Sequence, residues 1–230
     1  MGIFNKTAPA PMSTSMVDLT KKAAVSLQKA GLSGQKAAVY LVLDHSGSMH
    51  GFYRNGDVQR LAEQALGLSA NLDDDGTVPV IYFGSQASPA FNVQLTDYQG
   101  VITRTHVGVP WGTTNYTAAM DTVVSHHQQS GASEPALVIF QTDGAPDNRR
   151  SVEQALRAYS KGPFFWSFVG FGGRVAFLEK LDELDGRAVD NASFFHAANP
   201  QAVSDEQLYD GITREYAGWI AAARAAGIVR

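Results

Sequence analysis

Short apolar runs alternate along the chain with stretches in which apolar residues recur at helical spacing. Compact apolar runs are typical of strands covered on both faces, whereas the longer period is typical of amphipathic helices. The runs predict strands at residues 38–44, 78–83, 136–143, 164–171 and 193–196. The helical periods predict helices at residues 17–30, 58–72, 98–103, 115–129, 149–160, 175–184 and 205–226. Because such alternation produces mostly parallel sheets with helices on both faces, the pattern indicates a doubly wound α/β fold.

The length of the chain limits the number of domains. With 230 residues, 44% of them hydrophobic, it is long enough for one large domain and crowded for two. Residues 1–16 are rich in Ala, Pro, Ser and Met without periodicity, so we expect a flexible tail followed by a single domain over residues 17–230. No window approaches the roughly 18 apolar residues of a membrane span, and the first residues lack the pattern of a secretory signal. The expected location is the cytoplasm.

Charge and cysteine content narrow the function classes. The formal net charge is −4, and no basic cluster is longer than the pairs Lys21-Lys22 and Arg149-Arg150. Phosphate contacts require a basic surface, so we expect no nucleic-acid partner. The absence of cysteine excludes disulfides, thiol catalysis and cysteine-ligated zinc sites.

Polar residues end two of the predicted strands. Asp44 closes the first strand and is followed by Ser46 and Ser48, and Asp143 closes the third. A polar loop at residues 112–115 precedes a predicted helix between them. Since ligands of such folds gather at the carboxyl ends of the strands, we expect these residues to meet at one edge of the sheet. Carboxylate and hydroxyl oxygens are the hard ligands that Mg2+ and Mn2+ prefer.

These loops resemble the metal-ion-dependent adhesion site of von Willebrand factor A domains, in the same order and strand-loop context. Seven residues carry the resemblance: Asp44, Ser46, Gly47, Ser48, Thr114, Asp143 and Gly144. The usual Gly-Gly-Thr corresponds here to residues 112–114, with Thr114 aligned. The resemblance implies direct metal contacts from the two serines and Thr114, while the two aspartates contact the ion or orient its waters. The implied ion is Mg2+ or Mn2+, with Ca2+ as an alternative, and another protein's Asp or Glu carboxylate completes its shell.

Further segments resemble the A domain at the C terminus of TerF-type tellurium-resistance proteins. They are LVLDHSGSM, the DDDG at residues 73–76, FFWSFVGFG, LEKLDELDGRAVDNASFF and SDEQLYDGITREYAGWI. This resemblance extends over residues 17–229 and implies a single six-stranded, mostly parallel sheet. It also implies a non-enzymatic protein-interaction module of a bacterial tellurite or chemical-stress system.

The sequence leaves two other functions open. A metal-dependent phosphoester hydrolase would use the same ion to activate water, with His45 or Asp147 as the candidate general base. A metal-free scaffold would use Ser46 and Ser48 only to cap turns and helices. Ser46 lacks the Gly-x-Ser-x-Gly surroundings of a hydrolase nucleophile, and the chain contains no P-loop motif.

Other polar residues are expected to have mostly structural roles. His126 and His127 are predicted to be a solvated pair on a helix, because adjacent helical residues point about 100° apart. Residues 73–76 are predicted to form a turn between a helix and a strand. Asp147 is expected either to add negative charge at the site or to cap the following helix. His45 is not at a ligand position of the resembling family, and we expect a structural role for it, with framing of the partner-binding rim as the alternative.

Overall fold

The computed structural model describes residues 14–73 and 75–230 of the chain. Within them, six strands form one sheet in the order β3-β2-β1-β4-β5-β6, and only the β2–β3 pair is antiparallel. The strands are β1 (Ala38–Asp44), β2 (Thr77–Phe83), β3 (Phe91–Gln94), β4 (Ala136–Thr142), β5 (Phe164–Phe171) and β6 (Ala192–Ala197). The chain therefore has the predicted six-stranded, doubly wound α/β fold, whose order changes direction beside β1.

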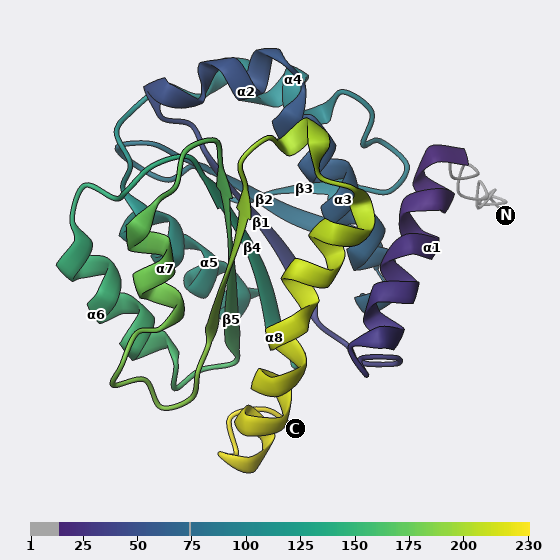
Figure 1. Cartoon of the computed structure of the whole chain (residues 1–230), viewed down its shortest axis with the longest axis vertical. Helices are drawn as coiled ribbons and strands as arrows, with labels where there is room; N and C mark the ends of the chain where they lie inside the picture. Colours follow the sequence, from purple (N-terminus) through teal and green to yellow (C-terminus); the bar gives the residue numbers. More distant parts are fainter. Residues whose placement is uncertain (1–13, 74) are drawn as a thin grey trace, which may run out of the picture.

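Helices cover both faces of the sheet (Figure 1). One face packs against α1 (Thr14–Lys29), α3 (Asp57–Leu72) and α8 (Asp205–Ala225). The other packs against α5 (Tyr116–Ser130), α6 (Arg149–Tyr159) and α7 (Ala176–Asp182). Two short helices, α2 (His50–Arg54) and α4 (Val101–Thr105), lie at the end of the molecule where β1 finishes, seen at the top of Figure 1. The described residues also form three single 3-10 turns, η1 (Gly47–Met49), η2 (His106–Gly108) and η3 (Pro200–Ala202).

The central strand β1 shows how the sequence produces the two layers. Val39, Leu41 and Leu43 belong to the core beneath α1, α3 and α8, whereas Tyr40 and Val42 belong to the core beneath α5, α6 and α7. Successive side chains of a strand point to opposite faces, so a continuous apolar run fills both cores at once. Asp44 ends this run as its first acidic side chain.

One strand and one α-helix were not predicted. Strand β3 has only four residues, of which Val93 alone is buried, and it pairs at the edge of the sheet. Helix α2 has only five residues and follows η1 without an apolar period. Segments this short contain too few positions for a periodic pattern to develop.

The first helix begins earlier than predicted. Helix α1 starts at Thr14, and Met16 is fully buried, so the end of the predicted tail belongs to the packed domain. The remainder of that tail, residues 1–13, lies outside the described residues. The predicted stop at Gly31 agrees with its left-handed backbone, with φ of 73°. No helix of the described residues has both the length and the apolar character that crossing a membrane requires.

Candidate metal centre

The loops after β1 and β2 and the loop before α5 are joined by backbone hydrogen bonds. The amide of Gly112 donates to the carbonyl of His45 at 3.1 Å, and the amide of Gly47 donates to the carbonyl of Gly112 at 3.3 Å. Asn115 donates in turn to the carbonyl of Gly84 at 2.9 Å. A Cβ atom at Gly112 would lie only 3.0 Å from the carbonyl carbon of Gly84 and would overlap Ser85. Glycine at this position therefore permits the close approach of the two loops.

Asp44 is fully buried at the end of β1. Its Oδ1 accepts a hydrogen bond from the amide of Ser46 at 2.7 Å, and its Oδ2 accepts one from Thr142 Oγ1 at 2.6 Å. Burial raises the pKa of Asp44 to about 6, although the hydrogen bonds from Thr142 and Ser46 oppose the rise. A carboxylate held in this way is costly to keep charged unless a cation compensates it.

Hydroxyl groups connect the β1 loop to the end of β4. Ser48 Oγ donates to Asp143 Oδ1 at 2.8 Å, and Ser46 Oγ lies 3.2 Å from Ser48 Oγ. Burial raises the pKa of Asp143 as well, against the effect of the hydrogen bond from Ser48. Four of the five predicted ligands therefore lie in one hydrogen-bonded group, which confirms the expectation that they meet at one edge of the sheet.

Thr114, the fifth predicted ligand, is hydrogen-bonded to Asp147 in the loop after β4 rather than to the other four. The amide of Thr114 lies 3.2 Å from both carboxylate oxygens of Asp147, and the amide of Asp147 donates to the carbonyl of Thr114 at 3.0 Å. The hydroxyl of Thr113 donates to Asp147 at 2.6 Å, whereas the hydroxyl of Thr114 makes no hydrogen bond within the described ranges. The neighbouring threonines thus differ, and only Thr114 keeps its hydroxyl unengaged.

Asp147 does not cap the next helix, contrary to one of its two predicted roles. The cap of α6 is Asn148, whose side chain accepts from the amide of Ser151 at 3.0 Å. The carboxylate of Asp147 instead holds the loop before α5 against the loop after β4. Its remaining predicted role is that of a negative charge beside the site.

Two tyrosines that the sequence did not single out donate hydrogen bonds to the backbone of these loops. Tyr53 Oη donates to the carbonyl of Asp44 at 2.9 Å, and Tyr116 Oη donates to the carbonyl of Gly144. Both tyrosines are buried, so each hydroxyl fixes the backbone beside one of the two aspartates. Tyr53 belongs to the unpredicted helix α2, and its role depends on a tertiary contact that no local pattern signals.

His45 lies in the wall of the site rather than on its rim. Its ring is fully buried and stacks on Trp111 at a centroid distance of 3.6 Å, and the exposed His50 stacks on Trp111 at 3.7 Å. Its Nε2 is 3.3 Å from His106 Nδ1, and its Nδ1 is 3.3 Å from the carbonyl of Pro110. Burial lowers the pKa of His45 to about 4, so this ring is neutral at pH 7. Both of its nitrogens already have partners.

The donor set fits a hard divalent cation. Neither Asp44 nor Asp143 has an ion-pair partner among the residues that the structure describes. The same residues contain no group of three or more His, Cys, Asp or Glu side chains placed to bind a metal. An ion at this edge would therefore depend on the hydroxyl groups of Ser46, Ser48 and Thr114 as well as on the two carboxylates, a set of oxygen ligands that suits Mg2+ or Mn2+.

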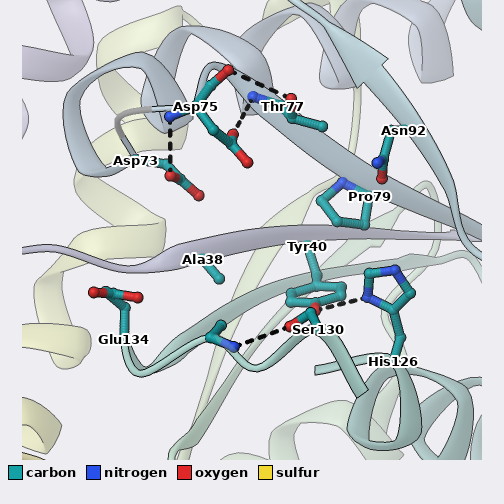
Figure 2. A pocket seen from close by; sticks show the side chains of 11 residues that line it. Ala38, Tyr40, Asp73, Asp75, Thr77, Pro79, Asn92, His126, Ser130 and Glu134 are labelled. Carbon is teal, nitrogen blue, oxygen red and sulfur yellow. Dashed lines mark hydrogen bonds between the residues drawn. The ribbon is translucent and has the colours of Figure 1, made fainter. Parts of the chain in front are cut away.

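A cavity of about 350 Å³ lies at the end of the sheet opposite to these loops (Figure 2). There His126 Nδ1 is 2.9 Å from the hydroxyl of Tyr40, and His127 is only 4% exposed, with Nε2 2.9 Å from the carbonyl of Glu134. The prediction of a solvated histidine pair is therefore wrong, because both rings pack against Tyr40 at the end of α5.

The predicted turn at residues 73–76, before β2, borders the cavity at this end of the sheet. Asp73 accepts from the amide of Asp75 at 3.3 Å, and Asp75 accepts from the amide of Thr77 at 2.7 Å (Figure 2). These are turn contacts of the kind aspartate makes, and they confirm the predicted helix-to-strand turn for its described residues.

Known proteins include a relative of similar sequence and solved structures of similar fold. The Bacillus subtilis (strain 168) protein named "Uncharacterized protein YcbR" is 34% identical over 221 residues, covering 93% of this chain and 90% of that protein. A von Willebrand factor type A structure from Catenulispora acidiphila has a TM-score of 0.54 at 17% identity, over 80% of this chain and 43% of that one. Manganese-loaded Plasmodium vivax TRAP protein has a TM-score of 0.52 at 22% identity, over 77% and 74% of the two chains.

A mussel byssus protein, proximal thread matrix protein 1 with a zinc-occupied MIDAS motif, has a TM-score of 0.52 at 13% identity. The match covers 78% of this chain and 48% of the mussel chain, so this chain spans less than half of both the mussel and the Catenulispora chains. At these identities the structures show a shared fold. The family described as the von Willebrand factor A domain found in the TerF C terminus matches residues 36–229. The chain belongs to this family.

Proposed function

We propose that this domain is a metal-dependent protein-interaction module. One Mg2+ or Mn2+ ion would be held by Ser46, Ser48 and Thr114, with Asp44 and Asp143 contacting it directly or through water. An open coordination position would then accept an Asp or Glu carboxylate from another protein. The observation that carries the proposal is the pair of strand-end carboxylates that, within the described part of the chain, lack a cation partner and lie beside serine hydroxyls.

Solved structures of the same fold suggest which metal ions to test. TRAP protein was solved with manganese and the mussel protein with zinc in its MIDAS motif. The ligand types in this chain, carboxylates and hydroxyls without cysteine, favour Mg2+ or Mn2+ over zinc. The tellurite or chemical-stress setting and the cytoplasmic location are further predictions from the sequence.

Metal-assisted hydrolysis has weaker support from the geometry. A general base must lie within reach of the water that it deprotonates. His45 is buried with both ring nitrogens engaged, and the carboxylate of Asp147 accepts from Thr113 and Thr114. We therefore expect no turnover of phosphoesters, which an assay with a phosphoester panel would check.

Calorimetric titration tests the proposal directly. EDTA-stripped protein is titrated with Mg2+, Mn2+, Ca2+ and Zn2+, and we expect saturable binding with one ion per chain. Thr114→Val should weaken Mg2+ binding about tenfold or more, because each lost inner-shell oxygen removes a contact that water replaces only in part. Thr113→Val is the matched control, since the hydroxyl of Thr113 donates to Asp147, and it should retain most of the affinity.

The controls also separate the alternatives. If the two threonine variants bound Mg2+ equally well, Thr114 would not be a ligand and its alignment would be wrong. If the unmodified protein bound none of the four ions, the metal-dependent module would be rejected in favour of a metal-free scaffold.

A further inference from the structure

A cavity of about 470 Å³ opens beside Asp143, next to the proposed metal centre. Its walls come from the loop after β4, the first residue of α6 and the start of α7. Three of its lining residues are cationic: Arg149, Arg174 and Lys180. Although the chain carries a net charge of −4, this cavity concentrates positive side chains at the edge of the site.

Two of these three cations are already paired. Arg174 donates to both carboxylate oxygens of Glu179, at 2.6 and 2.8 Å, and Lys180 donates to Glu153 at 2.6 Å. Their charges are thereby compensated within the protein.

Arg149 is different, because it has no ion-pair partner in the part of the chain that the structure describes. Its guanidinium group lies over the ring of Phe177, with 5.7 Å between the guanidinium carbon and the ring centroid. This stacking supports the side chain at the cavity wall while leaving its hydrogen-bond donors available. Arg149 is thus a cation without an acceptor among the described residues, held beside an opening.

A metal ion at the site would change the charge balance of the cavity. Asp143 is the acidic residue among those that line the cavity. A bound divalent cation would compensate Asp143 and leave no negative charge in the cavity to face Arg149. The planar guanidinium group is suited to bidentate contact with a carboxylate.

We propose that this cavity binds a second carboxylate of the same partner segment whose first carboxylate binds the ion. The partner recognised by this surface is then a segment with two acidic side chains, one for the metal and one for Arg149. This inference rests on the proposed function, because the first contact requires the ion.

Short synthetic peptides of defined charge provide the test. The full chain, 15N-labelled and saturated with Mg2+, is titrated in NMR experiments with acetylated and amidated Gly/Ser peptides. One peptide contains a single Asp, and the others contain two Asp residues separated by one, two, three or four glycines. We expect the best two-Asp peptide to bind about fivefold tighter than the single-Asp peptide, from one added charge-assisted contact near the surface. Amide shifts at residues 144–149 and 174–177 should accompany the gain.

Arg149→Gln should abolish this fivefold preference while leaving the affinities for Mg2+ and for the single-Asp peptide unchanged. Arg150→Gln is the matched control, because Arg150 is the exposed neighbour that does not line the cavity, and it should keep the preference. Both side chains are exposed, so each variant should fold, and its amide spectrum shows whether it does.

The outcomes distinguish failure of the second carboxylate site from failure of the proposed metal-dependent function. Mg2+-dependent binding of the single-Asp peptide without any gain from a second Asp would overturn the second carboxylate site and leave the proposed function standing. Equal loss of the preference in both arginine variants would also overturn it, because the effect would then be one of general charge. If neither peptide bound in a Mg2+-dependent manner, the proposed function would fail and this inference with it.

Discussion

The buried carboxylate of Asp44 lowers the stability of the metal-free fold at a position suited to bind a cation. Its carboxylate is fully buried, and burial raises its pKa from 3.8 to about 6. Between these two pH values the folded chain binds more protons than the unfolded chain, so its stability falls as the pH rises from about 4 to above about 6. At pH 7 the charged side chain therefore destabilises the metal-free protein, as is expected of a group placed to bind a cation.

Replacing this charge should stabilise the metal-free protein. The raised pKa of Asp44 corresponds to roughly 3 kcal/mol at neutral pH, and the amide of Asn would weaken one hydrogen bond worth about 1 kcal/mol. In EDTA at pH 7.5, Asp44→Asn should raise the free energy of unfolding by about 1–2 kcal/mol while abolishing Mg2+ binding. Urea unfolding at pH 7.5 and at pH 4.5 checks this, with a smaller gain expected at pH 4.5. A loss of stability at both pH values would contradict this account.

Gly112 carries a second residue-scale prediction. Because a Cβ atom there would overlap Ser85 and crowd Gly84, Gly112→Ala should separate the loops and lower stability by about 1–3 kcal/mol. Mg2+ affinity should fall as well, since the β1 loop that carries Ser46 is hydrogen-bonded to Gly112. Gly47→Ala is the matched control, because a Cβ atom at Gly47 would meet no atom within 4 Å and its φ is not positive. Equal effects of the two changes, by chemical denaturation and calorimetry, would show that the close approach is unimportant.

Among the helices, α1, α3 and α8 are joined through one carboxylate. Asp205, in the first turn of α8, accepts from Lys22 at 2.9 Å, Arg60 at 3.2 Å and Gln64 at 2.8 Å. Burial alone would raise the pKa of Asp205, but the hydrogen bonds from Lys22, Gln64 and Arg60 lower it overall. A lowered pKa means that the stabilisation is present above the pKa of the unfolded chain, near 3.8, and is lost as the pH falls through the folded value.

We expect Asp205→Asn to lower the free energy of unfolding by about 1–2 kcal/mol at pH 7, because three donors lose a charged acceptor. The difference from the unmodified protein should shrink as the pH falls from about 3.8 through the lowered pKa of the folded chain. Glu206→Gln is the matched control in the same turn, since Glu206 lies 3.8 Å from Lys22 and is more exposed. Thermal unfolding of the three proteins across this pH range measures the effect, and a penalty in the control equal to that of Asp205→Asn would refute the special role of Asp205.

Long elements of this chain could be predicted from its sequence, whereas the shortest ones could not. The strands that fill both cores were located closely, because each is a long apolar run with polar ends, as at residues 38–44 and 164–171. Strand β3 and helix α2 were missed because their few residues make contacts that depend on the finished sheet. Tyr53 was not predicted for the same reason, since its contact with Asp44 forms only in the folded chain. For Asp147 the sequence predicted a charge at the site, but not its contacts with the loop before α5.

On the scale of the whole molecule, the site joins parts of the chain that no single helix or strand connects. Its loops follow β1 and β4 and precede α5, so an ion bound there would link the central strands to the helices on one face. The fold assembles these loops with their carboxylates uncompensated, and a ligand that binds only the folded chain stabilises all of it. We therefore expect a single ion both to compensate the strand-end carboxylates and to stabilise the whole domain.

Mg2+ should consequently stabilise the whole domain, and it should do so only by binding at this site. At a Mg2+ concentration about 100 times the dissociation constant, the stabilisation should be about 2.7 kcal/mol, which raises the Tm of a domain of this size by about 5–10 °C. Scanning calorimetry in EDTA and in Mg2+ measures the shift, and a series of Mg2+ concentrations should move a single transition. Asp44→Asn should show the same Tm in both buffers, at a value above that of the unmodified protein in EDTA. Because a general effect of ionic strength would move both proteins alike, equal shifts would indicate a scaffold whose strand-end aspartates bind no ion.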